Sequence, residues 1–255
     1  MKAESLALLY DVHGNLPALE AVLADVEERD VDGIVFGGDY ALKGPHPSEC
    51  VDRIRETGMP AIRGNTDVEI LEQEPIGSPD PLVAWTRQQL GAGRRRWLAQ
   101  RPFEHRIRPP SGSSPRDDLL LVHATPTDIE AVLLLEPHPY EGWPVTPDAD
   151  AKEMIGDAVA NLIVFGHIHS ASEGAVAGQP VRSVGSVGFP WDGDPRAAYA
   201  IAEWRDGGWN VDDIRVAYDH EAVADEIESS EIPDADKHAE SIRTAGFEPT
   251  PRTGL

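Results

Sequence analysis

Blocks of apolar residues alternate with blocks of mixed polarity along the first third of the chain. Short apolar runs predict buried strands, and apolar residues at helical spacing predict helices that pack on them. These patterns predict strands at residues 5–10, 33–37 and 60–63, and helices at residues 16–29 and 48–56. Ser48 is a candidate N-cap of the second helix. The alternating order predicts parallel strands joined by right-handed crossovers, which is an α/β arrangement.

The rest of the chain changes its pattern near residue 170. Before it, helices are predicted at residues 81–90, 94–100 and 148–160, and strands at residues 103–108, 119–122 and 161–165. After it, short apolar segments at 174–177, 181–184, 199–204 and 211–216 alternate with glycine-rich turns, which is typical of antiparallel sheet. Two helices are predicted within about residues 220–246. No repeat or linker interrupts the chain, so we expect a single α/β (α+β) domain over residues 1–255 that contains two sheets.

The charge balance of the chain is strongly acidic. It has 22 basic and 45 acidic residues among 255, which is a formal net charge of −23 at pH 7. Its hydrophobic fraction of 40% is that of a globular protein and not of a disordered one. The acidity argues against stable binding to nucleic acids or to anionic membranes, because both partners are polyanions.

Cysteine content and the apolar runs indicate the cellular compartment. Cys50 is the only cysteine, which excludes an intramolecular disulfide framework and a zinc knuckle built on cysteine. The apolar run at residues 6–10 is too short for a signal peptide, and no run of about 18 apolar residues could cross a membrane. We therefore expect a cytoplasmic protein without a membrane partner.

Side chains that can bind metals follow five of the predicted strands, at the point where each strand ends. They are Asp11 and His13, Asp39, Asn65, His123, and His167 with His169. Asp39 follows Asp11 by 28 residues and Asn65 follows Asp39 by 26, which is about the length of one strand–helix unit. Because ligands of open α/β sheets bind beyond the carboxyl ends of the strands, we expect these residues to meet at one edge.

Two aspartates, one asparagine and four histidines form a mixed set of oxygen and nitrogen donors. Such donors suit Mn, Fe, Zn, Ni or Co without demanding one of them. Seven donors are too many for one tetrahedral ion, and they suit two ions about 3.5–4 Å apart that share a bridging carboxylate. A lone histidine or aspartate at a strand end is commonly structural, but turn chemistry does not explain the whole ordered set. The set therefore predicts a dinuclear metal centre that acts on phosphoryl groups.

The same residues form five ordered motifs, which are Asp11-x-His13, Gly38-Asp39, Gly64-Asn65, His123 and Gly166-His167-x-His169. Through them the sequence resembles the calcineurin-like metallophosphoesterase superfamily. Residues 11–22, 44–50, 185–188 and 193–199 are similar to its small prokaryotic phosphodiesterase branch, which is also called diadenosine-tetraphosphatase-like. The likeness extends over nearly the whole chain. It implies two packed mixed β-sheets flanked by helices, the four-layer sandwich of that family.

The resemblance also implies roles for single residues. Asp11, His13, Asp39 and His169 would hold one metal, and Asp39, Asn65, His123 and His167 would hold the other, with Asp39 as the bridge. Two divalent ions are implied, with Mn favoured and Fe, Zn, Ni, Co or Mg as alternatives. A metal-bridging hydroxide would attack phosphorus in line, and Asn65 and His167 would help to bind phosphate oxygens. Asp39, Asn65 and His167 are thus the implied catalytic residues.

Three residues beside these motifs bear on the substrate. Asn15 and Arg63 adjoin the predicted site and are candidates for phosphate contacts, although a surface ion pair is an equal alternative for Arg63. Many members of the family carry a histidine after Gly-Asn that can protonate the leaving group. Thr66 takes that place here, which puts activity on poor leaving groups in doubt.

We therefore expect a metal-dependent phosphoesterase, in particular a phosphodiesterase that acts on a small nucleotide or a similar organic phosphate. The acidic surface disfavours long polyanions, but it tolerates a small phosphate that reaches two divalent cations. A phosphomonoesterase or protein phosphatase with the same ligands is one alternative. A non-catalytic metal-binding scaffold on the same fold is another, although a scaffold need not keep all seven ligands. The oligomeric state stays open.

The acidic excess also predicts a response to salt. Of the 22 basic residues, 18 are arginine and four are lysine, namely Lys2, Lys43, Lys152 and Lys237. An acidic surface with few lysines is expected of a halophilic protein, because salt screens its self-repulsion; an ordinary acidic cytosolic protein is the alternative. We expect folding and activity to persist or improve in molar KCl. A lower melting temperature in molar KCl than in dilute buffer would contradict the halophilic hypothesis.

Overall fold

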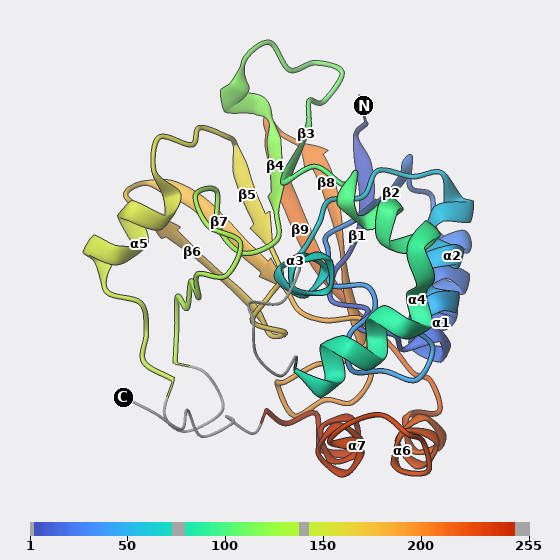
Figure 1. Cartoon of the computed structure of the whole chain (residues 1–255). Helices are drawn as coiled ribbons and strands as arrows, with labels where there is room; N and C mark the ends of the chain where they lie inside the picture. The colour runs from blue at the N-terminus through green and yellow to red at the C-terminus, as the bar shows by residue number, and fades with distance from the viewer. Residues whose placement is uncertain (1–2, 73–79, 138–142, 248–255) are drawn as a thin grey trace.

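The computed structural model describes residues 3–72, 80–137 and 143–247 (Figure 1). In these residues nine strands form two mixed sheets, with the order β2-β1-β8-β9 in the first and β3-β4-β5-β7-β6 in the second. The strands are β1 (Ser5–Leu9), β2 (Gly33–Phe36), β3 (Glu104–Ile107), β4 (Leu119–Val122), β5 (Leu162–Phe165), β6 (Ala171–Val176), β7 (Gln179–Val184), β8 (Ala197–Arg205) and β9 (Gly208–Val216).

The first sheet contains both parallel and antiparallel pairs. β1 runs parallel to β2 and antiparallel to β8, and β9 runs antiparallel to β8. Successive side chains of a strand point to opposite faces of its sheet, so a strand with apolar residues throughout can be buried on both. In β1, Leu6 and Leu8 pack in the layer between the two sheets, whereas Ala7 and Leu9 pack against helices on the other face.

The second sheet is built in the same way. β4 and β5 are parallel neighbours, β7 runs parallel to β5, and the edge strands β3 and β6 are antiparallel to their partners. Leu119 and Leu121 of β4 face the first sheet, while Leu120 and Val122 face outward. Of the strands in parallel pairs, β1, β2, β4 and β5 are short and apolar, and each ends in a loop that carries a polar motif.

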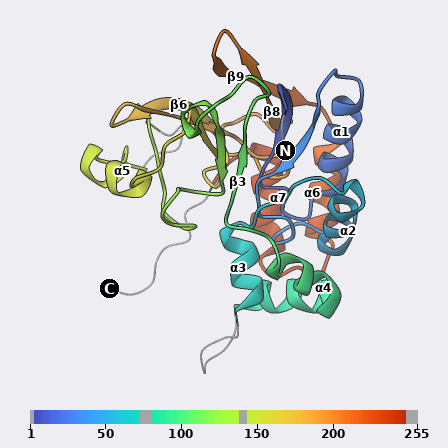
Figure 2. The same cartoon turned by 90° about the horizontal axis from the view of Figure 1, so that it is seen from above.

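Helices cover the outer faces of the two sheets. α1, α2 and α4 bury Leu19, Val51 and Leu90 against the first sheet, and α5 buries Ile155 against the second, so the layers run helices, sheet, sheet, helix (Figure 2). The helices are α1 (Leu16–Glu27), α2 (Pro47–Thr57), α3 (Asn65–Leu71), α4 (Pro81–Ala99), α5 (Asp148–Ile155), α6 (His220–Glu228) and α7 (Ala235–Thr244). The predicted fold class, two packed mixed sheets flanked by helices, is confirmed.

The predicted third strand at residues 60–63 is wrong. Only an isolated parallel bridge joins Phe36 to Ala61. The Phe36 N–H donates to the carbonyl of Pro60, and the Ile62 N–H donates to the carbonyl of Phe36. Pro60 has no N–H to extend the ladder, and the chain enters α3 a few residues later, so the pairing stops after one step.

The helices of the first half differ from the prediction in three places. α2 begins at Pro47, and His46 rather than Ser48 is its N-cap, because proline at the first helical position has the right φ angle already. The Ser48 hydroxyl donates instead to the carbonyl of Gln89 at 2.8 Å. The helix α3 was not predicted, and the two predicted helices at 81–90 and 94–100 both lie in α4, which Gly91 interrupts with a φ of 61°.

The two predicted C-terminal helices are present as α6 and α7, which pack on each other and on the side chain of Phe189. In Figure 1 they lie below the first sheet, near the beginning of α4, whose Leu82 and Trp85 pack against them. Across the described ranges, no helix combines the length and apolar character that crossing a membrane would require.

A substitution in the layer between the two sheets tests how these sheets pack on each other. Leu8 of β1 is fully buried between the two sheets, and Leu8→Ala is expected to lower the free energy of unfolding by about 2–5 kcal/mol, through lost apolar burial and the cavity left behind. Val159 is 38% exposed, and Val159→Ala should change it by less than about 0.5 kcal/mol. Urea unfolding followed by circular dichroism measures both. Equal stability of Leu8→Ala and the unchanged protein would contradict this packing.

Candidate metal centre

The structure brings the seven predicted ligands together beyond the carboxyl ends of four parallel strands. Asp11 and His13 follow β1, Asp39 follows β2, His123 follows β4, His167 and His169 follow β5, and Asn65 is the first residue of α3. Candidate ligand atoms of Asp11, His13 and His169 lie within 4.8 Å of one another, and so do those of Asp11, Asp39 and His123. Asp11 belongs to both of these groups, whereas the sequence motifs implied that it serves one metal only.

Five of these residues have a left-handed backbone, which non-glycine residues rarely adopt. Their φ angles are 56° at Asp11, 48° at His13, 58° at Asp39, 65° at His167 and 53° at His169. Each such residue costs about 1–3 kcal/mol and persists only where the surroundings hold it in place. Backbone hydrogen bonds from Asp11 N–H to the Gly38 carbonyl (3.2 Å) and from His13 N–H to the Asp39 carbonyl (2.9 Å) provide part of that support.

His13 and His169 turn unprotonated nitrogens toward each other. His13 Nδ1–H donates to the carbonyl of Leu42 at 3.0 Å, and His169 Nδ1–H donates to the carbonyl of Phe189 at 2.5 Å. Burial lowers the pKa of both rings well below the usual value, so both are neutral and Nε2 holds a lone pair in each. The two Nε2 atoms are 3.0 Å apart. Two lone pairs at this distance repel each other unless a cation lies between or beside them.

Carboxylate oxygens surround this pair of rings. Oδ1 of Asp11 lies 3.5 Å from His169 Nε2, and Oδ2 of Asp39 lies 3.5 Å from His13 Nε2. Asp11 Oδ1 is buried and has no hydrogen-bond partner among the residues that the structure describes, although Oδ2 of the same group accepts from the His167 N–H at 2.9 Å. We refer to Asp11, His13, Asp39 and His169 as the first ligand cluster.

A second ligand cluster consists of Asp39, Asn65, His123 and His167. Oδ1 of Asn65 lies 2.9 Å from His123 Nε2 and 3.0 Å from His167 Nδ1, and Oδ1 of Asp39 lies 3.5 Å from His123 Nε2. Burial lowers the pKa of His123 to about 4 and that of His167 to about 3. Both rings are therefore neutral.

Backbone carbonyls outside the second cluster determine the tautomers of its two histidines. His123 Nδ1–H donates to the carbonyl of Gly37 at 2.9 Å, and His167 Nε2–H donates to the carbonyl of Glu130 at 3.2 Å. The other nitrogen of each ring then points a lone pair at the carbonyl oxygen of Asn65. This cluster too presents only acceptor atoms, so it is suited to a cation.

The carboxylates of Asp11 and Asp39 also favour a bound cation. Burial raises the pKa of Asp11 well above its usual range, and the Asp39 charge raises it further. Burial also raises the pKa of Asp39, to about 6. Divalent cations would relieve the cost of these buried anions as well as the repulsion between lone pairs. The residues present therefore fit divalent metals with mixed oxygen and nitrogen ligands.

Asp67 holds the loop of Asp39 in position. Its carboxylate accepts from the N–H groups of Asp39 (2.9 Å), Gly64 (2.9 Å) and Tyr40 (3.2 Å). The group is fully buried, and burial raises its pKa to about 7. A Cβ atom on Gly64 would lie 2.0 Å from Oδ1 of Asp39, so only glycine allows this approach. Thr66 donates its N–H to the same oxygen at 3.0 Å.

The two predicted substrate contacts have different surroundings. Asn15 is fully buried, and its Nδ2 donates to the carbonyl of Gly188 (2.8 Å) and to the hydroxyl of Tyr218 (3.1 Å). Its Oδ1 accepts from the Ala18 N–H at 3.2 Å and caps α1. No amide hydrogen is left for a phosphate, so the structure favours a positioning role for Asn15. Arg63 is half-buried, and its Nε has no hydrogen-bond partner.

Sequence reasoning missed Lys43 and Trp191, which lie against the first ligand cluster. The ring of Trp191 stacks on His169, with centroids 3.7 Å apart and an interplanar angle of 18°. The Lys43 amine lies 4.7 Å from the centre of the same Trp191 ring. A signal for Lys43 exists in the sequence, since it follows Asp39 by four residues in a chain with four lysines. No local pattern marks Trp191.

Comparisons with known proteins agree with the geometry. A family model described as the calcineurin-like phosphoesterase superfamily domain matches residues 5–207, which include all seven ligands. The uncharacterized protein MJ0912 of Methanocaldococcus jannaschii is 26% identical over 245 residues, 92% of this chain and 96% of that protein. The phosphodiesterase YfcE of Escherichia coli is 32% identical over 98 residues, 33% of this chain and 53% of YfcE. A metallophosphoesterase from Sphaerobacter thermophilus, known from a crystal structure, has a TM-score of 0.72 at 25% identity, over 96% of this chain and 100% of that one.

The role of Asp67 can be tested by Asp67→Asn, which keeps the shape but places an NH₂ group against a backbone N–H donor. The variant should lose about 1–3 kcal/mol in the free energy of unfolding, because a buried donor is left without an acceptor. Its affinity for Mn²⁺ should fall about 10–100-fold, since Asp39 loses its support. Urea unfolding and calorimetric titration with Mn²⁺ measure the two effects.

The matched control is Asp157→Asn, which changes an exposed carboxylate in the turn after α5 and should alter neither quantity. If a folded Asp67→Asn protein bound Mn²⁺ as tightly as the control, Asp67 would not position the cluster.

Proposed function

This chain belongs to the calcineurin-like phosphoesterase superfamily and is a phosphoester hydrolase, and we propose that it hydrolyses phosphodiesters of small nucleotides or similar organic groups at two divalent metal ions. The observation that supports two metals is the pair of clusters made only of acceptor atoms. One has His13 and His169 Nε2 atoms 3.0 Å apart, and the other has two imidazole nitrogens around Asn65 Oδ1. The diester preference is supported by the likeness to a phosphodiesterase, YfcE.

In this proposal each cluster holds one metal. The first metal would be held by Asp11, His13, Asp39 and His169, and the second by Asp39, Asn65, His123 and His167. Asp39 suits the bridging position because its two oxygens face different clusters, Oδ2 toward His13 and Oδ1 toward His123. When bound, two divalent cations lower the pKa of coordinated water and neutralise charge that develops on a phosphoryl group.

The chain's own residues fix the geometry for this chemistry. Four backbone carbonyls, one for each histidine, hold the rings in a single tautomer and orientation. Of the seven ligands, Asn65 and His167 are half-buried and the other five are buried. Asn65 and His167 therefore lie on the accessible side, which supports their proposed contacts with phosphate oxygens.

The residue after Asn65 affects which esters react. Thr66 is buried, and its N–H is bound to Asp39, so it offers no imidazole to protonate a leaving group. We therefore expect esters with good leaving groups, such as nitrophenyl diesters, to react faster than alkyl diesters.

Three finer statements belong to the same proposal. Mn²⁺ is the favoured ion because the mixed oxygen and nitrogen donors suit it. A cytoplasmic location is supported by the single cysteine, and a halophilic habit by the excess of 45 acidic over 22 basic residues. A non-catalytic scaffold is the second candidate, and it is disfavoured because both clusters are assembled with their supporting hydrogen bonds.

The decisive experiment loads the purified, chelator-treated protein with Mn²⁺ and measures metal content together with hydrolysis of bis-p-nitrophenyl phosphate. We expect about two ions per chain, as a two-metal site requires, and turnover of the diester in excess of that of p-nitrophenyl phosphate. Absence of turnover with every divalent metal tested, in low and in high salt, would refute the enzymatic function.

The variant Asp39→Ala tests the bridging assignment. It should abolish turnover and lower the metal content at both positions, because each cluster loses a ligand. Asp157→Ala changes an exposed aspartate outside both clusters and should retain the metal content and the rate. Two tightly bound metals in Asp39→Ala would show that Asp39 is not the bridge.

A further inference from the structure

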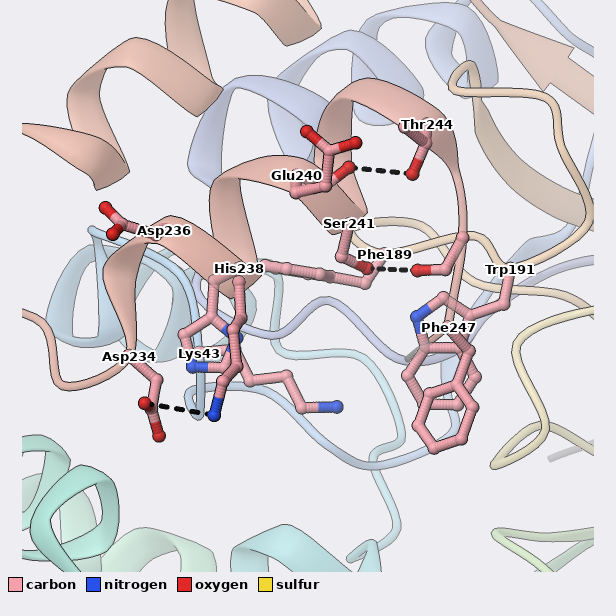
Figure 3. A pocket seen from close by; sticks show the side chains of 12 residues that line it. Lys43, Phe189, Trp191, Asp234, Asp236, His238, Glu240, Ser241, Thr244 and Phe247 are labelled. Carbon is pink, nitrogen blue, oxygen red and sulfur yellow. Dashed lines mark hydrogen bonds and ion pairs between the residues drawn. The ribbon is translucent and has the colours of Figure 1, made fainter. Parts of the chain in front are cut away.

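A cavity of about 540 Å³ opens beside the first ligand cluster (Figure 3). One wall consists of Lys43, Phe189 and Trp191, and the other consists of the helix α7 and Phe247, which follows it. Its volume lies within the range of about 300–1,000 Å³ that is usual for sites of small organic ligands. α7 supplies none of the seven ligands, so this wall has no part in holding metals.

The first wall of the cavity is also the supporting layer of the ligand cluster. Trp191 stacks on His169, Phe189 accepts a hydrogen bond from His169 Nδ1–H, and the Phe189 ring lies edge-to-face on His13 at 5.8 Å. The same side chains thus contact the histidines on one side and line the cavity on the other. A substrate whose phosphate sits at the clusters has this cavity as adjacent space for its organic group.

One part of the cavity surface is aromatic, with Phe189, Trp191 and Phe247 among its twelve lining residues. Phe247 lies against Trp191, with ring centroids 4.4 Å apart and an interplanar angle of 46°, and it stays half-buried. Figure 3 shows these two rings together at one end of the cavity, with Phe189 between them and His238. Flat apolar side chains of this kind pack well against planar rings such as nucleobases.

Lys43 places a positive charge between the cavity and the metal clusters. Its amine makes no hydrogen bond or close ion pair with any residue in the described ranges. The Trp191 ring lies 4.7 Å away, and the carboxylates of Asp39 and Asp11 interact with the amine electrostatically over a longer distance. Its backbone φ of 88° is a strained value for lysine, which indicates that the surrounding loop holds it in place. In contrast, Lys237 on the opposite wall is paired with Asp234 at 3.2 Å. Unlike Lys237, Lys43 therefore keeps its N–H donors free of any acceptor in the described residues, so they can donate to an anion placed beside the first ligand cluster.

The two ends of the cavity differ in charge. Asp236 and Glu240 of α7 are exposed carboxylates on the far wall, whereas Lys43 lies on the wall nearest the clusters. Acidic groups repel phosphate and the ammonium group attracts it. A ligand with one phosphate and one neutral ring is therefore oriented with the phosphate at Lys43 and the ring toward α7.

We propose that this cavity is a subsite for the organic group of the substrate, that this group contains a planar aromatic ring, and that Lys43 contacts the phosphoryl oxygens. This inference rests on the phosphodiesterase function proposed above and narrows its substrates to phosphodiesters with an aromatic group such as a nucleoside.

Two probes that differ only in the ring test the subsite. Adenosine 5′-monophosphate and ribose 5-phosphate have the same sugar phosphate, and only the first has an aromatic base. In calorimetric titrations of the Mn²⁺-loaded protein, we expect the nucleotide to bind at least about tenfold more tightly, since stacking of one base is worth about that much or more. Equal affinities would overturn the proposal.

Variants then locate the effect. Phe247→Leu keeps apolar bulk without the aromatic face, and Phe247→Ala removes both; each should lower the nucleotide affinity about 5–10-fold and leave that of ribose 5-phosphate unchanged. Lys43→Met should weaken both probes by a similar factor. If the folded Phe247 variants kept the full preference for the nucleotide, the ring would not bind at this wall.

The controls are Trp204→Leu and Lys152→Met, which change an aromatic side chain at the far end of β8 and an exposed lysine of α5. Neither should alter the affinity for either probe. Hydrolysis of bis-p-nitrophenyl phosphate is measured in parallel. Turnover without nucleotide preference would refute the subsite alone, and nucleotide preference without turnover would refute the phosphodiesterase function alone.

Discussion

The repulsion among buried acceptor atoms is the constraint on which this structure depends. Each histidine of the clusters uses one nitrogen to donate to a backbone carbonyl, which forces the lone pair of the other nitrogen inward. Two such lone pairs meet 3.0 Å apart, and a buried carboxylate oxygen of Asp11 beside them has no donor. An apolar core would never adopt this arrangement for stability, because an unpaired buried acceptor costs more than a hydrogen bond returns. The arrangement is the one expected of a cation site, because a bound cation would offset the repulsion among these acceptor atoms.

The rest of the fold has to hold these acceptor atoms together, because without a cation their repulsion favours moving them apart. Five of the candidate ligands have left-handed backbones, and both carboxylate oxygens of Asp67 accept hydrogen bonds, from three N–H groups of the neighbouring loops in total. The strands behind them are apolar on both faces, and their side chains have no exposed surface in β4 and almost none in β5. The packing of the buried strands thus fixes the ends of the loops and keeps the loops in their strained backbone conformation.

The sequence predicted that the seven candidate ligands meet at one edge of the sheets because strand ends have a local signature, an apolar run followed by a polar residue that often comes after glycine. It failed where the outcome depended on distant partners. Residues 60–63 had the composition of a strand, but one proline and the start of α3 limited the pairing to a single bridge. For Asn15, the sequence did not show that Gly188 and Tyr218, far along the chain, accept its amide hydrogens. Lys43 and Trp191 are separated by more than half of the chain and meet only in the folded protein.

The net charge of −23 and the cavity beside the clusters act together on the choice of ligand. A long polyanion would have to lie across an acidic surface, and its approach would be opposed at every contact outside the site. A compact phosphate makes few contacts with the acidic surface, because Lys43 and His169 of the first ligand cluster both lie against Trp191 in the cavity wall. The acidic residues of α7 add a second selection at short range, since they oppose a second phosphate at the far end while tolerating a neutral ring. The net charge of the chain and the charges around the cavity therefore both favour the class of ligand proposed above, a compact phosphodiester in which one organic group carries a flat ring.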